Sequence, residues 1–172
     1  MRDIMNTVQQ GELPADALLA KYKLQGARTD CYFIDLPMKV TQADYIEAFY
    51  TSNLFKVERF ILTHLARRPS NDEQATQLSH GEVDHFAAWS VEQQTPNQLL
   101  LCDYLGKTRS WLKSIDSENG KSTRLYFGSA VIPKRSNSGG EAEFGMLFNA
   151  LGGFHHLYSK ALLKAAFTRL LQ

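Results

Sequence analysis

The pattern of apolar residues changes twice along the chain. Before Phe86 they recur at helical spacing in short segments, and from there to about residue 132 they alternate with polar residues. Alternation with a period of two is typical of half-buried antiparallel strands. The stretch 144–171 returns to helical spacing. This order predicts an α+β fold, in which an antiparallel β-sheet is wrapped on a long C-terminal helix.

Start and stop signals divide the first half of the chain into one strand and several short helices. Thr41 can cap a helix, and Asp44 stands where the acid of a capping box belongs. The basic pair Arg67-Arg68 followed by Pro69 ends the next helix. The expected elements are an N-terminal helix from Pro14 to before Gly26, a strand over 31–34, and helices over 42–50, from Ser52 or Asn53 to Arg67, and over 72–79.

Four antiparallel strands are expected in the second half. Asn119-Gly120 is the strongest turn signal, because both residues tolerate the positive φ of a tight hairpin. A second two-residue turn is expected at Gly106-Lys107. Turns of fixed length set the register between strands and therefore the faces of the sheet. The expected strands are 86–92, 99–105, 108–114 and 123–132.

This register predicts which side chains share a face. Asp103 lies opposite Ser110, and Ser110 opposite Ser129, as a polar row on a largely apolar face that we interpret as the inner one. The other face mixes aromatic and basic side chains, which suits a partly wet surface. Trp89 is placed on that outer face, opposite Tyr104. The inner face carries Leu99, Leu101, Leu112, Leu125, Phe127 and Val131, and the outer face carries Leu100, Cys102, Tyr104, Trp111, Tyr126 and Ala130.

Composition and charge exclude several classes of protein. A chain of 172 residues is long enough for one domain with a real core, with 1–28 as an N-terminal helical extension. With 19 basic and 18 acidic residues, the net charge of +1 indicates neither nucleic-acid binding nor a polybasic membrane patch. No segment approaches the roughly 20 apolar residues of a membrane helix, and no secretion signal is visible. We therefore expect a soluble cytoplasmic protein, with Cys31 and Cys102 as reduced thiols.

The polar row is the most suggestive chemistry. Asp103 with Ser110 and Ser129 could be a satisfied structural cluster, or it could anchor the polar end of a ligand in an apolar pocket. Neither serine has a histidine near it in the sequence, so a hydrolase triad has little support. His155 and Tyr158 stand three residues apart on the C-terminal helix and could share a face.

Other clusters of charged residues carry less weight. His80, Glu82, Asp84 and His85 lack the helical spacing of a metalloprotease motif, so we expect no metal and no cofactor. The pairs Glu58-Arg59 and Arg67-Arg68 are interpreted as solvated helix faces.

The hairpin from Thr108 through Gly120 to Leu125 and the closing helix from Met146 to Leu157 are similar to segments of uncharacterised bacterial proteins. With the order of elements over about 29–171, the chain resembles the START-like helix-grip superfamily. That group includes lipid-transfer domains, polyketide cyclases and pollen-allergen-like proteins. The resemblance implies a cavity between sheet and helix without a fixed catalytic residue, although fuller members have more strands than we count here.

Three functions remain open. The leading one is binding of a small hydrophobic molecule or lipid between the inner face and the C-terminal helix. The second is a cyclase- or hydratase-like enzyme in the same cavity, with Asp103 or His155 as acid–base group. The third is an interaction module that forms a homodimer through the outer aromatics; no nucleic acid and no integral membrane contact is expected. The pocket candidates are Ser90, Leu101, Asp103, Ser110, Leu112, Phe127, Ser129, Phe154, His155 and Tyr158, and the interface candidates are Trp89, Tyr104, Trp111 and Tyr126.

Overall fold

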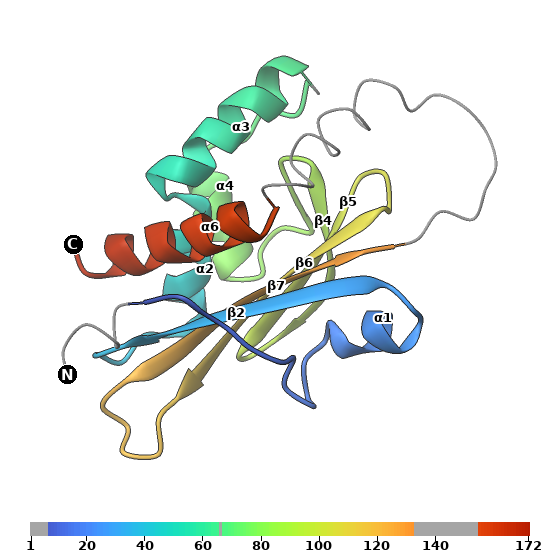
Figure 1. Cartoon of the computed structure of the whole chain (residues 1–172). Coiled ribbons are helices and arrows are strands. Elements are labelled where there is room, and N and C mark those ends of the chain that lie inside the picture. Colours follow the sequence, from blue (N-terminus) through green and yellow to red (C-terminus); the bar gives the residue numbers. More distant parts are fainter. Residues whose placement is uncertain (1–6, 66, 133–154) are drawn as a thin grey trace.

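One antiparallel sheet of seven strands organises the chain (Figure 1). The computed structural model describes residues 7–65, 67–132 and 155–172. The strands follow the order β1-β2-β7-β6-β5-β4-β3, so the first long strand pairs with the last. Their bounds are β1 (Gln9–Gln10), β2 (Arg28–Leu36), β3 (His85–Phe86), β4 (Trp89–Thr95), β5 (Gln98–Asp103), β6 (Thr108–Asp116) and β7 (Thr123–Val131).

Helices cover mainly one face of this sheet. The C-terminal helix lies across that face and contacts β2, β7 and two other helices, while the short N-terminal helix lies on the opposite side of the sheet (Figure 1). The predicted α+β class, with helices after the first long strand and a closing C-terminal helix, is confirmed. The helices are α1 (Ala20–Leu24), α2 (Gln42–Tyr50), α3 (Asn53–Leu65), α4 (Asp72–Ser79) and α6 (His155–Leu170).

Local signals place the helix ends well. The Thr41 hydroxyl accepts the amide of Asp44 at 3.1 Å, and the Asp44 carboxylate accepts the Thr41 amide at 3.1 Å, so the predicted capping box starts α2. Asn71 and Gln74 form the same arrangement at the start of α4. The N-terminal helix begins later than predicted, at Ala20 and not next to Pro14.

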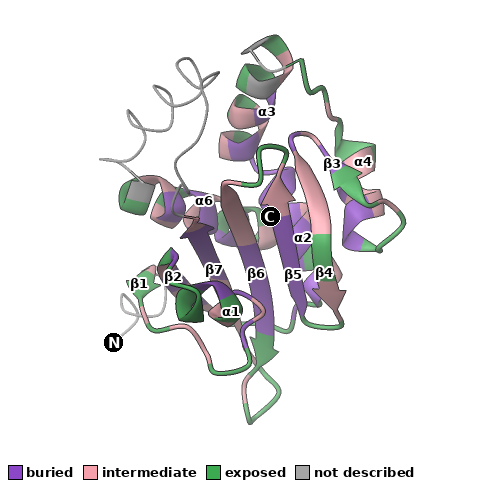
Figure 2. Cartoon of the chain, turned by 90° about the vertical axis from the view of Figure 1, so that its right-hand side faces the viewer, coloured by how far each residue is buried: buried purple, intermediate pink, exposed green. Residues whose placement is uncertain are grey.

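The inner face is the expected one, and aromatic rings fill the space above its middle. The Phe49 ring lies 5.0 Å from that of Phe127, and the Tyr50 ring lies 4.8 Å from that of Phe55 and 5.1 Å from that of Phe86. Figure 2 shows the buried residues running along the central strands of the sheet. The inner-face leucines belong to this cluster: Leu99, Leu101, Leu112 and Leu125.

A β-bulge at Glu92 moves Trp89 to the inner face, so its predicted outer position is wrong. The turn itself has the expected register, with Gln94 opposite Leu99. The register then shifts between Val91 and Gln93, so that Trp89 pairs with Asp103 and not with Tyr104. One inserted residue reverses the side of every residue beyond it, and Trp89 packs against the inner core.

The register between β5 and β6 also differs from the prediction. The expected two-residue turn is a four-residue loop, 104–107, and Ser110 pairs with Leu101 and not with Asp103. The observed pairing differs from the expected one by two residues, so each side chain stays on its predicted face of the sheet. Asp103, however, no longer lies opposite Ser110, and the predicted polar row does not form. The hairpin between β6 and β7 is confirmed, with Leu112 opposite Phe127 and Ser110 opposite Ser129.

The middle of the outer face, which we expected to be partly wet, is covered by the chain's own N-terminal segment, while Cys102, Arg109 and Tyr126 around it are half-buried. Three residues of this segment, Leu19, Ala17 and Tyr22, pack on Leu100 and Trp111, and Trp111 is fully buried.

Within the described residues, none of the helices has the length and apolar character that a membrane span requires.

Candidate functional site

The middle of the inner face is core and not pocket. Leu101, Leu112 and Phe127, three of the pocket candidates, are buried in the aromatic cluster under α2. Phe154 and the side chain of His155 lie outside the described residues.

The polar row separates into independent contacts. One Asp103 carboxylate oxygen accepts the amides of Lys107 at 2.7 Å and Thr108 at 3.1 Å, which closes the β5–β6 loop. The Ser129 hydroxyl and amide both donate to the Asp30 carboxylate at 2.8 Å. Asp103, Ser110 and Ser129 therefore do not form the single cluster that the predicted register required.

Two open hollows lie at the ends of the sheet. One of about 400 Å³ is lined by Ser90, Asp103, Trp89 and Tyr104, with the Arg68 guanidinium 5.0 Å from the Tyr104 ring centroid. The other, of about 480 Å³, lies between the start of α2 and the ends of β4 and β6. No residue of α6 lines either hollow, so neither is the predicted cavity between sheet and helix.

A pair of polar side chains joins α6 to α3 beside the inner face of the sheet. The Tyr158 hydroxyl donates a hydrogen bond to the Glu58 carboxylate, and this joins α6 to α3. Burial raises the pKa of the Glu58 carboxyl to about 7, although the bond from Tyr158 acts in the other direction. Burial, together with the nearby Glu58 charge, raises the pKa of the Tyr158 hydroxyl. Near neutral pH, Glu58 can therefore hold or release a proton.

Tyr50 adds a buried hydroxyl at this place. Its oxygen is buried and has no hydrogen-bond partner among the described residues. Burial raises the pKa of the Tyr50 hydroxyl, the neighbouring Ser110 hydroxyl lowers it in part, and the Glu58 charge raises it further. Tyr50, Ser110 and Glu58 are therefore neighbours, although the Tyr50 and Ser110 hydroxyls do not have the geometry of a regular hydrogen bond. A buried polar atom without a partner is unfavourable by about 1–3 kcal/mol, and such atoms are rare in folded proteins. Tyr50, Glu58 and Tyr158 thus form a polar cluster beside Ser110 of β6.

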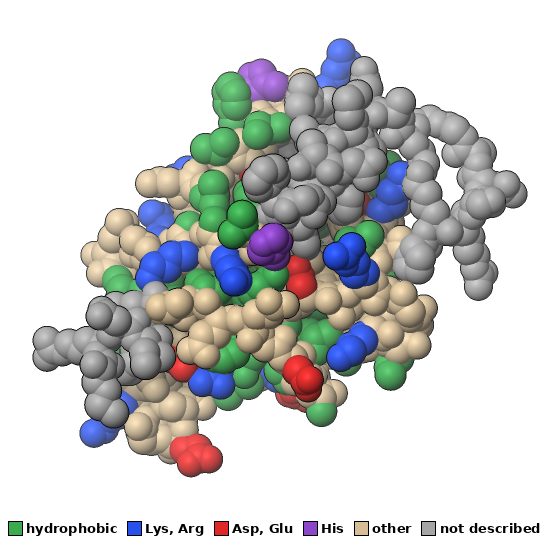
Figure 3. Space-filling view, in the orientation of Figure 1, with side chains coloured by type: hydrophobic (Ala, Val, Ile, Leu, Met, Phe, Trp, Pro, Cys, Tyr) green, Lys and Arg blue, Asp and Glu red, His purple; other side chains and the backbone are tan. Residues whose placement is uncertain are grey.

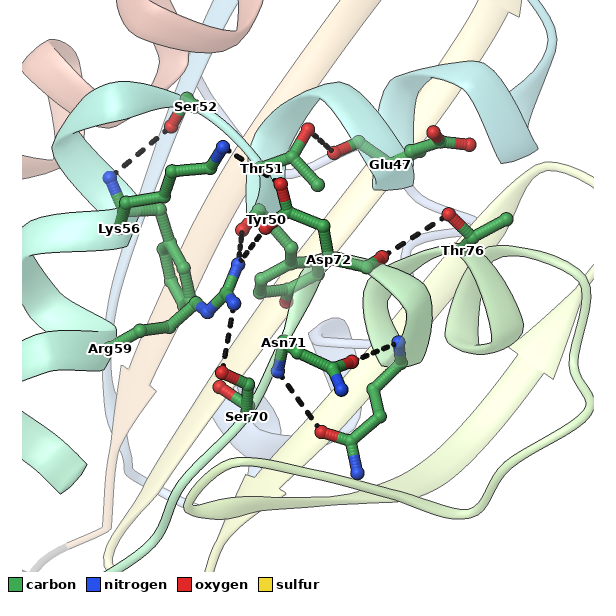
Figure 4. Close-up of polar contacts among 12 residues, drawn as sticks. Glu47, Tyr50, Thr51, Ser52, Lys56, Arg59, Ser70, Asn71, Asp72 and Thr76 are labelled. Carbon is green, nitrogen blue, oxygen red and sulfur yellow. Dashed lines mark hydrogen bonds and ion pairs between the residues drawn. The ribbon is translucent and has the colours of Figure 1, made fainter.

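The interpretation of Glu58-Arg59 as a solvated helix face is wrong. Arg59 is only 8% exposed and donates to the Asp72 carboxylate at 2.6 Å, to the Ser70 carbonyl at 2.8 Å and to the Tyr50 carbonyl at 3.4 Å (Figure 4). It fastens α3 to the end of α2, and so it holds Tyr50 in place. A signal was available, because Arg59 follows the buried Phe55 by one helical turn.

The interface candidates do not form one exposed surface. Trp111 is beneath the N-terminal segment, and Trp89 is on the inner face. Tyr126 is half-buried, and its ring lies 6.0 Å from that of Trp111. Of the four candidates only Tyr104, which lies in a turn, is exposed.

The described part of the chain contains no cluster of candidate metal ligands and no disulfide. There, no three His, Cys, Asp or Glu side chains gather where they could hold a metal ion. Cys31 and Cys102 are free thiols, and burial raises the pKa of Cys31 to about 12.

No protein-family model, curated protein or solved structure matches this chain. The class is therefore defined by the fold: an α+β protein whose seven-stranded antiparallel sheet packs against a C-terminal helix.

Proposed function

We propose that this chain is a START-like helix-grip protein that binds one small, largely apolar molecule or lipid between α3, α6 and the inner face of the sheet. Tyr50, Glu58 and Tyr158 bind the polar end of that molecule. The observation that carries the proposal is the Tyr50 hydroxyl, which is buried beside Ser110 without a regular hydrogen bond and next to a carboxyl group that can be neutral or charged.

The apolar surroundings of this cluster support the proposal. The Phe55 ring lies 4.8 Å from the Tyr50 ring and 5.8 Å from that of Trp89. Trp89 also lines the hollow of about 400 Å³, so its ring lies between the aromatic residues beside the cluster and an opening at the surface. Ligand sites commonly combine aromatic walls with a few polar groups in this way.

Two tyrosine variants separate binding from folding. Tyr50→Phe removes an unpaired hydroxyl, so it should leave stability unchanged or raise it by up to about 1 kcal/mol. Tyr45→Phe is the matched control, because the Tyr45 hydroxyl donates to the Tyr126 carbonyl at 2.9 Å and its loss should lower stability by about 1 kcal/mol.

Native mass spectrometry of the purified proteins gives the test. The wild type and Tyr45→Phe should carry a stoichiometric small molecule, and Tyr50→Phe should carry at least tenfold less. An empty wild type, or equal loading of Tyr50→Phe, would contradict the proposal.

An enzyme is the second candidate, favoured by the Glu58 carboxyl with a pKa of about 7. A cyclase- or hydratase-like reaction needs a group that exchanges a proton near neutral pH. Glu58→Gln would then retain unreacted substrate. The molecule released from this variant should differ in mass from that of the wild type, whereas a pure binder releases the same molecule from both.

A further inference from the structure

Helix α3 has apolar side chains on both of its sides. Phe55 and Arg59 face the core, while Val57, Phe60 and Ile61 on the other side are 56%, 64% and 38% exposed. Positions 57, 60, 61 and 64 form one stripe of a helix, so this is a continuous surface. It is not scattered exposure.

The first turn of α6 extends the same surface. Leu157 is 54% exposed, next to Tyr158, whose hydroxyl reaches Glu58 on α3. Figure 3 shows hydrophobic side chains over α3 and basic side chains over α6 on one face of the molecule. We define the α3–α6 face by its four exposed apolar residues, Val57, Phe60, Ile61 and Leu157.

The two helices of this face carry more basic than acidic side chains. Glu58 is the only carboxylate in α3, and it is hydrogen-bonded to Tyr158; α6 contains no acidic residue. Arg67 is exposed directly beyond α3, and the half-buried Lys160 of α6 has its ammonium group 5.8 Å from the Tyr32 ring centroid. An apolar ridge with basic neighbours and without exposed carboxylates on its own helices complements a negatively charged partner.

We propose that the α3–α6 face docks on the surface of an anionic lipid membrane. Its apolar area is on the order of 400 Å², about half of the roughly 800 Å² per partner of a stable protein interface. Side chains that protrude from a helix can enter the headgroup region of a bilayer, which needs no matching pocket, and basic residues beside them attract anionic lipid. This inference does not depend on the proposed ligand site.

Vesicle sedimentation tests the proposal with the full chain. The protein should bind vesicles of phosphatidylcholine mixed with phosphatidylserine, should bind phosphatidylcholine alone at least tenfold more weakly, and should dissociate as salt is added. The double variant Val57→Ser/Phe60→Ser should bind the anionic vesicles at least tenfold more weakly. Leu24→Ser is the matched control, because Leu24 is 88% exposed on α1, on the opposite side of the sheet.

Three results would overturn the proposal. The first is a wild type that sediments with neither vesicle, and the second is equal binding by the double variant. The third is a dimer, detected by light scattering, that the double variant abolishes, since this assigns the face to a second copy of the chain.

Discussion

The Tyr158 hydroxyl donates a hydrogen bond to the Glu58 carboxylate across the gap between the C-terminal helix and α3. The two residues are 100 positions apart in the chain. Their contact brings together the proposed ligand site and the α3–α6 face, because the half-buried Glu58 lies on α3 between the exposed Val57 and the buried Arg59. The charge of the Glu58 carboxyl group therefore affects the hydrogen bond that joins α3 to α6.

The first prediction concerns pH. The Glu58 pKa is raised from 4.5 to about 7 in the folded protein. Between these values the folded protein keeps a proton that the unfolded chain has lost, so this stabilisation is complete at low pH and is lost as the pH rises. The free energy of unfolding should fall by about 1–3 kcal/mol from pH 5 to 8 on this account. Urea unfolding at several pH values measures it.

Three variants check the assignment to Glu58. Glu58→Gln should remove this part of the pH dependence, whereas Glu118→Gln, in an exposed turn, should keep it. Tyr158→Phe removes a bond that favours the charged carboxylate, so it should move the fall to higher pH. An unchanged pH profile in Glu58→Gln would show that another group is responsible.

The second prediction compares two cations that share Asp72. Arg59 is buried and also donates to the Ser70 carbonyl, whereas Lys56 makes a 2.8 Å ion pair between side chains that are both partly exposed. Arg59→Met should lower the free energy of unfolding by about 2–4 kcal/mol, because it leaves buried carbonyl groups without donors. Lys56→Met should lower it by less than about 1 kcal/mol. Similar losses for the two variants in urea unfolding would contradict this account.

The third prediction concerns the N-terminal cover. Lys113 is 1% exposed and forms an ion pair with Asp16 of the N-terminal segment. Asp16→Asn leaves the buried Lys113 ammonium group without its anionic partner, but the Asp16 side chain is 67% exposed and water screens the pair, so we expect a loss of about 1–2 kcal/mol. The segment should then loosen over Trp111, and acrylamide should quench Trp111 fluorescence more strongly in a Trp89→Phe background.

An ion pair whose basic side chain is exposed provides the control for this experiment. Asp35 and Arg124 form an ion pair at 2.7 Å, with side chains that are 33% and 42% exposed. Asp35→Asn should lower stability by less than about 1 kcal/mol and leave the quenching unchanged. Equal quenching in the Asp16 and Asp35 variants would refute the role of Asp16 as the fastening of the cover.

The fourth prediction concerns Gly128 on the outer face of β7. A Cβ atom there would lie 2.9 Å from the Asp30 carbonyl oxygen, 3.0 Å from the Trp111 ring and 3.1 Å from Leu19. Gly128→Ala should lower the melting temperature, with a loss of about 1–3 kcal/mol from overpacking. Gly26→Ala meets no atom within 4 Å and is strained only by its φ of +85°, so its loss should stay near 1 kcal/mol. A smaller loss at Gly128 than at Gly26 would contradict the packing argument.

Structural features that depend on residues close together in the chain could be predicted from the sequence. The capping box of Thr41 and Asp44 joins positions three apart, and the turn around Gly120 sets the β6–β7 register. The β5–β6 loop was missed because the Asp103 carboxylate, and not glycine alone, closes it. A side chain that binds the loop backbone competes with the shorter turn.

At the candidate site, the sequence indicated Tyr158 but not its partner. Helical spacing placed Tyr158 on a face of the C-terminal helix, while the charge of Glu58 favoured a solvated interpretation. Its burial results from α6 packing against α3, and no pattern around residue 58 encodes that contact.

The sequence by itself determined the bounds of α2 and α4, the long central strands and their inner face, because periodicity, caps and tight turns act between near neighbours. The tertiary structure decided the rest. The bulge at Glu92 reversed Trp89, and the N-terminal segment covered Trp111 through the Asp16–Lys113 pair, whose residues are 97 positions apart. Such contacts form only when distant segments compete for the same apolar surface, and burial then changes the charge and the exposure of the residues between them.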